Sequence, residues 1–175
     1  QYPLGGGLGH TMETLLRLCE EIPTIVAIKD WCNDGMLHEK HIRVLRNLPR
    51  PVSVLTTHSA WLMSSLVMGC DGLLSGAGSV IADLQVELWL AVQSKDLSRA
   101  QKINERIYPM IQAFYAPPFL DMHNRMKEVA VLLGRLPKAV VRPPLCKLAD
   151  SEIQILRAAL KESGIEPVGA EKRAA

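Results

Sequence analysis

Residues 22–30 read Ile-Pro-Thr-Ile-Val-Ala-Ile-Lys-Asp, a short apolar run that follows a proline and ends in a pair of opposite charges. The apolar part, Thr24 to Ile28, predicts a strand covered on both faces, as in a parallel sheet. Lys29 and Asp30 close this strand at its carboxyl end, which is the edge where α/β folds place their ligands. The stretch therefore predicts an α/β fold with a functional site at this edge.

The sequence on either side continues the same alternation. Further strands are predicted at 52–57 and 72–75, separated and flanked by predicted helices at 12–21, 37–48, 60–68 and 80–93. Strands that alternate with helices predict βαβ units and a parallel sheet. After Ser94 the pattern changes to three helices, predicted at 97–115, 118–133 and 150–162. We therefore divide the chain into an α/β part at 1–94, a helical part at 95–164 and a flexible tail at 165–175.

Composition narrows the class of protein. The 175 residues are 48% hydrophobic and 22% charged, which is typical of a globular chain. The net charge of +2 argues against nucleic acid or an anionic membrane as the main partner, and no apolar run approaches the ~18 residues of a membrane span. The cysteines are far apart and form no CxxC pair, so we expect a reduced, cytoplasmic protein whose thiols are small core residues: Cys19, Cys32, Cys70 and Cys146.

Lys29 is the first candidate for chemistry. A lysine that is partly removed from water at the end of a buried strand can attack a carbonyl and form a Schiff base. The alternative is a solvated lysine at a strand end, which Asp30 beside it would hold in the charged form. The residues alone leave both open.

A glycine cluster, Gly5-Gly6-Gly7-Leu8-Gly9, provides a rival hypothesis. Such a loop before a helix can bring backbone N–H groups to a phosphate, and Asp30 follows at the distance expected of a ribose-binding carboxylate. This interpretation predicts a Rossmann-like protein that binds a nucleotide or S-adenosylmethionine. Its weakness is that Pro3 stands where the preceding strand should be, and a flexible loop explains the glycines equally well.

Other polar residues give weaker indications of function. His38 and His41 lie three apart on a predicted helix and could share a metal, but no third ligand is evident and a solvated helix face is the simpler interpretation. His58 follows the second strand as a candidate acid or base, although a lone histidine is more often structural. His123 is assigned to a packing surface, and the loop 75–79 to a tight turn or a close approach of a ligand.

The three strand ends together resemble the dihydrodipicolinate synthase and N-acetylneuraminate lyase family of class I aldolases. Residues 22–30 resemble strand six of the family, and residues 69–76 (Gly-Cys-Asp-Gly-Leu-Leu-Ser-Gly) resemble strand eight. The stretch Arg142-Pro143-Pro144-Leu145 also resembles the later part of the family pattern. The resemblance implies the later part of a (β/α)8 TIM barrel, about strands 6–8, with a C-terminal extension of three helices.

The resemblance also implies a reaction. Lys29 would form the Schiff base with a 2-oxo acid, commonly pyruvate, and the imine would support cleavage or formation of a C–C bond. Pro3 matches the proline of the family's Tyr-x-x-Pro motif, which puts the proton-relay tyrosine one residue before Gln1, and Tyr2 is the alternative if the loop is shifted. The substrate-binding positions would be Thr57, His58, Ser59, Leu74, Ser75 and Gly76.

Departures from the family pattern leave the specific reaction open. Thr57-His58-Ser59 stands where the family often has Gly-Asp-Asp, and the arginine that dihydrodipicolinate synthases carry after the proline is replaced by Leu4 and glycines. The resemblance implies no metal or organic cofactor and a homotetramer or dimer. A barrel needs roughly 250 residues, so we expect this chain alone to be incomplete and inactive. A binding module without catalysis is the third alternative.

Overall fold

The computed structural model describes residues 1–2 and 9–167, so most of the glycine cluster (Gly5 to Leu8) and residues 168–175 of the predicted tail lie outside the described residues. The chain divides into two compact units, Gln1–Ser75 and Gly76–Ala175. The first unit holds the sheet, and the second contains helices and connecting loops but no strand among its described residues.

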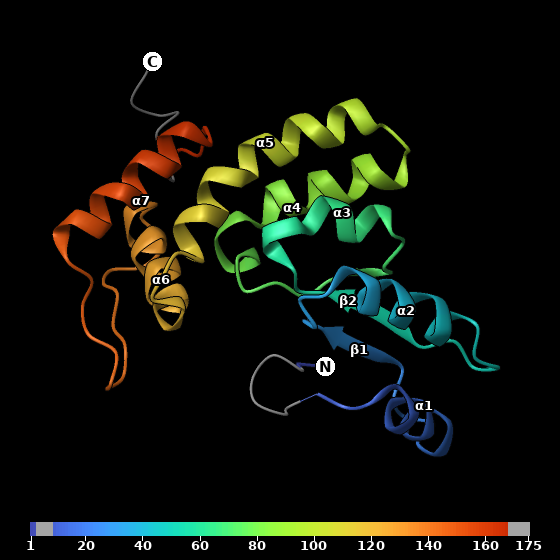
Figure 1. The fold of residues 1–175 in the computed structure, drawn as a ribbon. Coiled ribbons are helices and arrows are strands. Elements are labelled where there is room, and N and C mark those ends of the chain that lie inside the picture. Colours follow the sequence, from blue (N-terminus) through green and yellow to red (C-terminus); the bar gives the residue numbers. More distant parts are fainter. Residues whose placement is uncertain (3–8, 168–175) are drawn as a thin grey trace. The chain divides into compact units, whose positions relative to one another are not determined.

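Three parallel strands form the sheet of the first unit, in the order β1 (Ala27–Asp30), β2 (Ser53–Thr56) and β3 (Gly72–Leu73). Ala27 pairs with Ser53 and Asp30 with Thr56, so the carboxyl ends of β1 and β2 lie level with each other. Residues that follow these two strands are therefore brought side by side. Figure 1 shows the two strands as neighbouring arrows.

Helices of the first unit connect and flank the strands: α1 (Met12–Glu21), α2 (Gly35–Arg46), the 3₁₀ turn η1 (Ser59–Trp61) and α3 (Leu62–Val67). Both α2 and α3 pack on β2. Side-chain caps begin two of the helices, because Thr11 accepts from the backbone N–H of Thr14 at 3.2 Å and Asp34 accepts from the first turn of α2. Capping thus fixes the start of α2, which follows β1 in the chain after four residues.

Thr11→Ala is expected to lower the free energy of unfolding of the first unit by about 1 kcal/mol, because the first turn of α1 loses its side-chain acceptor. Chemical unfolding followed by circular dichroism measures the change. Thr24→Ala is the matched control, since Thr24 is exposed and lies outside the helices. Equal effects of the two substitutions would contradict the capping role.

The second unit is built from α4 (Gly78–Gln93), α5 (Leu97–Phe114), the 3₁₀ turn η2 (Phe119–Asp121), α6 (Met122–Leu132) and α7 (Asp150–Glu162). Its helices pack on one another through fully buried apolar side chains: Leu88, Ile107, Met110, Phe114, Leu133 and Leu156. The buried Arg125 guanidinium bonds Glu152 at 3.1 Å and four backbone carbonyl oxygens, those of Phe114, Ala116, Pro117 and Pro118. This network links the end of α5 to α6 and α7.

The order of predicted elements is confirmed, but some details are wrong. The first strand begins at Ala27 instead of Thr24, and Val26 is 67% exposed, so this run is not buried on both faces. The helix predicted at 118–133 starts as a 3₁₀ turn and becomes α-helical only at Met122. Cys146 is exposed, unlike the other three cysteines. Among the described residues, no helix is both long and apolar enough to cross a membrane.

Candidate functional site

The predicted nucleophile, Lys29, is the third residue of β1 and its side chain is exposed. The described residues therefore do not remove this lysine from water, and of the two alternatives left open they favour the solvated strand-end lysine. Asp30, the next residue, is fully buried. Successive side chains of a strand point to opposite faces, so the lysine and the carboxylate leave the sheet on opposite sides.

Polar residues predicted to bind substrate follow the neighbouring strands. Thr57, His58 and Ser59 come directly after β2 and are all buried. The Oγ atoms of Ser59 and Ser75 lie 2.5 Å apart, so the ends of β2 and β3 share a hydrogen bond. Leu74 is 51% exposed beside them. The first unit therefore brings Ser59 and Ser75 together.

Tyr2 lies at the free edge of β1. The backbone carbonyl of Gln1 accepts from the Trp31 N–H at 2.9 Å, and the Tyr2 and Trp31 rings have centroids 4.9 Å apart. Gly76 begins the second unit, where a β-carbon added to it would lie 3.6 Å from Cε of Met126.

A buried network of hydrogen bonds occupies the face of β1 opposite Lys29. The Oδ2 atom of Asp30 lies 2.8 Å from Nδ1 of His38 and 2.7 Å from Nδ1 of His41. All three side chains are fully buried. The assignment of these histidines to a solvated helix face is therefore wrong: they lie on the side of α2 that faces the sheet.

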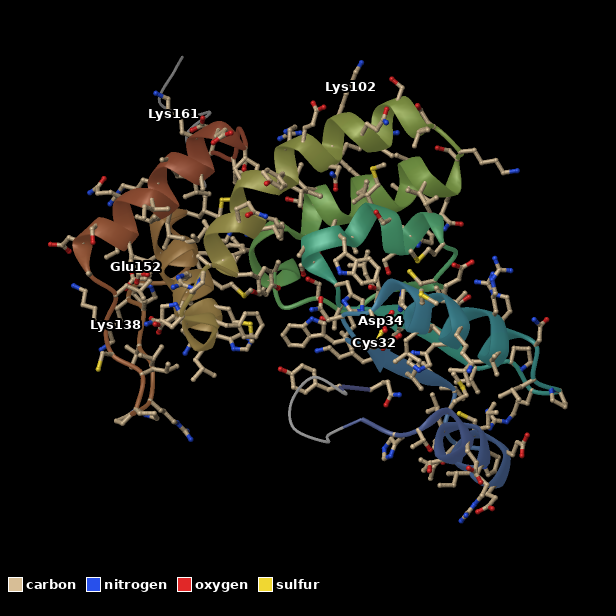
Figure 2. The ribbon with its side chains drawn as sticks, in the orientation of Figure 1. Cys32, Asp34, Lys102, Lys138, Glu152 and Lys161 are labelled. Atoms are coloured by element: carbon tan, nitrogen blue, oxygen red, sulfur yellow. The ribbon has the colours of Figure 1, made fainter. Side chains whose placement is uncertain are left out.

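Cys32 and His58 extend this network. The Cys32 Sγ atom is 3.7 Å from Oδ2 of Asp30 and 3.9 Å from Nε2 of His58, and the Cys32 backbone N–H donates to Oδ1 of Asp30 at 3.1 Å. The His58 ring stacks on Trp61 with centroids 4.1 Å apart. Figure 2 labels Cys32 and Asp34 where the chain leaves β1 and enters α2.

Burial and hydrogen bonding oppose each other in the ionisation of this network. Burial tends to raise the pKa of Asp30, but hydrogen bonds from His38 and His41 outweigh it and hold the pKa well below its usual range. Burial tends to lower the pKa values of the two histidines, whereas their hydrogen bonds to Asp30 raise them, to about 11 for His38 and about 9 for His41. These directions favour an ionised Asp30 carboxylate that accepts hydrogen bonds from protonated imidazoles.

The Cys32 thiol is also shifted toward its anion. Burial tends to raise its pKa, but hydrogen bonds to His38, His41 and His58 lower the pKa to about 6. The sequence contained one usable signal for this network. His38, His41, Ile42 and Leu45 follow the i, i+3, i+4, i+7 spacing of a core-facing helix stripe, and all four are buried.

The network corrects two further hypotheses. The carboxylate of Asp30 pairs with histidines, so it is not the partner that would hold Lys29 charged. For the same reason the nucleotide-binding interpretation is not supported, because its proposed ribose-binding carboxylate is fully buried and already bonded twice.

Comparisons with known proteins agree on the family. Residues 2–163 match the Dihydrodipicolinate synthetase family, and the chain therefore belongs to it. A 4-hydroxy-tetrahydrodipicolinate synthase from Symbiobacterium thermophilum is 28% identical over 152 residues, which are 87% of this chain and 49% of that protein. The chain thus spans about half the length of the curated relatives it matches.

Solved structures match the fold. A monomeric dihydrodipicolinate synthase variant superposes with a TM-score of 0.85 at 21% identity, covering 94% of this chain and 54% of that one. A prophage protein of the same family from E. coli K12, solved in complex with pyruvate, gives a TM-score of 0.76 at 23% identity, covering 85% of this chain and 49% of that one. The α/β unit with its parallel sheet therefore corresponds to part of the TIM barrel of this family.

Proposed function

We propose that the protein is a lyase or synthase that forms a Schiff base between Lys29 and a 2-oxo acid, pyruvate in the first instance. The observation that carries this proposal is the position of Lys29 in β1 of a chain that belongs to the dihydrodipicolinate synthetase family. Hydroxyl groups that follow β2 and β3 at the same edge of the sheet support it. The pyruvate complex of the E. coli relative suggests the substrate to test first.

The chemistry follows from the amine. The neutral amine of Lys29 adds to the carbonyl carbon, and loss of water gives a protonated imine. This cation withdraws electrons from the neighbouring carbon, so a proton or a C–C bond there can be lost to leave an enamine. The enamine carbon then attacks an aldehyde or takes up a proton, and hydrolysis of the imine releases the product and the free lysine. No metal or organic cofactor is required for these steps.

The substrate-binding groups are proposed from their positions. Thr57 and Ser59 follow β2, and Leu74, Ser75 and Gly76 follow β3, so they would line the pocket around the keto acid and a second substrate. His58 was predicted to bind substrate as well, but its buried ring stacks on Trp61 and its Nε2 atom lies 3.9 Å from the Cys32 sulfur, so we propose that it positions the end of β2 instead. Tyr2 would relay protons if its hydroxyl reaches the imine.

The correspondence with the barrel is part of the proposal. We assign β1, β2 and β3 to strands six to eight of a (β/α)8 barrel, residues 1–94 to its later portion and 95–164 to the helical extension. The active protein would combine these residues with the front of the barrel. We expect that protein to be a cytoplasmic homotetramer or dimer.

Borohydride trapping tests the assignment of Lys29. Full-length protein is incubated with pyruvate and borohydride, which delivers hydride to the imine carbon and makes the bond to lysine permanent. Peptide mass spectrometry is expected to find one reduced pyruvate adduct, on the peptide that contains Lys29. An adduct on another lysine, or none at saturating pyruvate, would contradict the proposal. Lys40, which is exposed on α2, is the internal control for nonspecific modification.

A further inference from the structure

Four donor atoms of three kinds lie close together near the carboxyl end of the sheet. Asp30 ends β1, Cys32 follows two residues later, His38 lies in the first turns of α2 and His58 follows β2. One ligand atom from each of these side chains lies within 4.8 Å of every other. All four side chains are at most 2% exposed. The parallel pairing of β1 with β2 is what brings His58 to the other three.

Two of the separations lie close to those of a tetrahedral zinc site, and all of them are within 4.8 Å. Zinc–ligand bonds of about 2.0–2.3 Å place neighbouring ligand atoms about 3.3–3.6 Å apart. The Cys32 Sγ atom lies 3.7 Å from Oδ2 of Asp30 and 3.9 Å from Nε2 of His58, within a few tenths of an ångström of that range. Oδ2 of Asp30 and Nδ1 of His38 are hydrogen-bonded at 2.8 Å. Around a metal ion the distance between these two atoms would increase by about half an ångström.

The donor set selects the metal. A thiolate, two imidazole nitrogens and one carboxylate oxygen are ligands that zinc binds together, whereas magnesium and calcium prefer oxygen alone. The carboxylate and the thiolate would supply two negative charges to neutralise the divalent ion. A buried ion needs this balance, because an uncompensated charge is costly away from water.

Outer hydrogen bonds of the kind found around zinc are also present. Nε2 of His38 lies 2.6 Å from the Ser65 hydroxyl, which leaves Nδ1 to face the site, where zinc would displace the proton from Nδ1 to solvent. His41 bonds the ligand oxygen of Asp30 at 2.7 Å. His58 is the member without such support: Nδ1 has no hydrogen-bond partner among the described residues, and Nε2 makes only the long contact to sulfur. Coordination through Nε2 would give this buried ring one strong partner, and Nδ1 would stay as it is.

We propose that Asp30, Cys32, His38 and His58 bind one Zn²⁺ ion in a closed, structural site. The ion would tie the end of β1 to the end of β2 and to α2. It would thereby fix the strand ends that carry Lys29 and Thr57 without taking part in the reaction. This inference is independent of the proposed Schiff base, because it rests on the opposite face of β1.

Metal analysis and cobalt substitution test the site. Full-length protein purified without chelators is expected to contain one zinc per chain. After removal of metal with EDTA, one equivalent of Co²⁺ should give the near-ultraviolet charge-transfer band of a cobalt–thiolate bond and the intense visible bands of tetrahedral cobalt. A folded, metal-depleted protein that shows neither band with Co²⁺ would overturn the proposal.

Variants identify the ligands. Cys32→Ser is expected to lose the charge-transfer band and to weaken Co²⁺ binding more than about 100-fold, whereas Cys19→Ser, which removes a buried thiol of α1, should bind as the parent does. His58→Ala should keep the thiolate band but bind Co²⁺ more weakly. Ser65→Ala should weaken binding about 10–100-fold through His38. A thiolate band that survives Cys32→Ser, or unchanged affinity in His58→Ala, would overturn the assignment, and circular dichroism of each variant verifies folding.

Discussion

Replacing Lys29 by alanine is expected to slow exchange of the methyl protons of pyruvate for deuterium by about 10³-fold or more. The physical reason is that exchange requires an imine at the neighbouring carbon, and the imine requires a primary amine at this position. The assay does not depend on knowing the second substrate, because enamine formation precedes C–C bond formation. Nuclear magnetic resonance follows the loss of the methyl proton signal in deuterated buffer with full-length protein.

Lys29→Arg tests whether exchange needs a covalent bond to residue 29 or only a positive charge there. Arginine keeps the positive charge at the end of β1 but forms no imine under these conditions, so the same loss of exchange is expected. Lys40→Ala is the matched control, because Lys40 is an exposed lysine of the same unit. If Lys29→Arg exchanged the methyl protons of pyruvate at the parental rate, a positive charge at this position would be enough for exchange. The Schiff-base proposal would then fail.

The order of helices and strands could be predicted because local signals agree with the final fold. Thr11 and Pro23 bracket α1, and the predicted bounds of Met12–Glu21 are those observed. The start of β1 could not be predicted from hydrophobicity. Its residues are fixed by the ladder with β2, which pairs Ala27 to Asp30 with Ser53 to Thr56, and this pairing depends on residues far away in the chain.

The buried network was missed because its members are separated in sequence. The bonds from Asp30 reach eight residues to His38 and eleven to His41, and the Cys32–His58 contact spans 26 residues. Histidines on a helix are ordinarily polar and solvated, so the residue type of His38 and His41 was given more weight than their position. The position was nevertheless informative, since His38 and His41 share the stripe of Ile42 and Leu45. Periodicity was the better guide here than side-chain polarity.

Asp30→Asn is expected to lower the free energy of unfolding of the first unit by about 3–5 kcal/mol, measured in chelating buffer so that the metal-free protein is compared. Removing the carboxylate leaves the imidazolium groups of His38 and His41 buried without their anionic partner, and an uncompensated buried charge is strongly destabilising. Urea unfolding in a Trp89→Phe background measures the change, because the remaining tryptophans, Trp31 and Trp61, both lie in the first unit.

A substitution at a surface ion pair and a measurement at low pH are the controls for Asp30→Asn. Glu39→Gln breaks a partly exposed i, i+4 pair with Arg43 and should cost only about 0.5 kcal/mol or less. Since the pKa of Asp30 is lowered in the folded state, its contribution is present above the unfolded aspartate value of about 3.9 and is lost as the pH falls below it. The difference in free energy of unfolding between the parent and Asp30→Asn should therefore become smaller as the pH falls below this value. If Asp30→Asn lowers the free energy of unfolding at neutral pH by no more than Glu39→Gln does, the histidines do not depend on this carboxylate. Cys32 would then have to be their principal partner in the network.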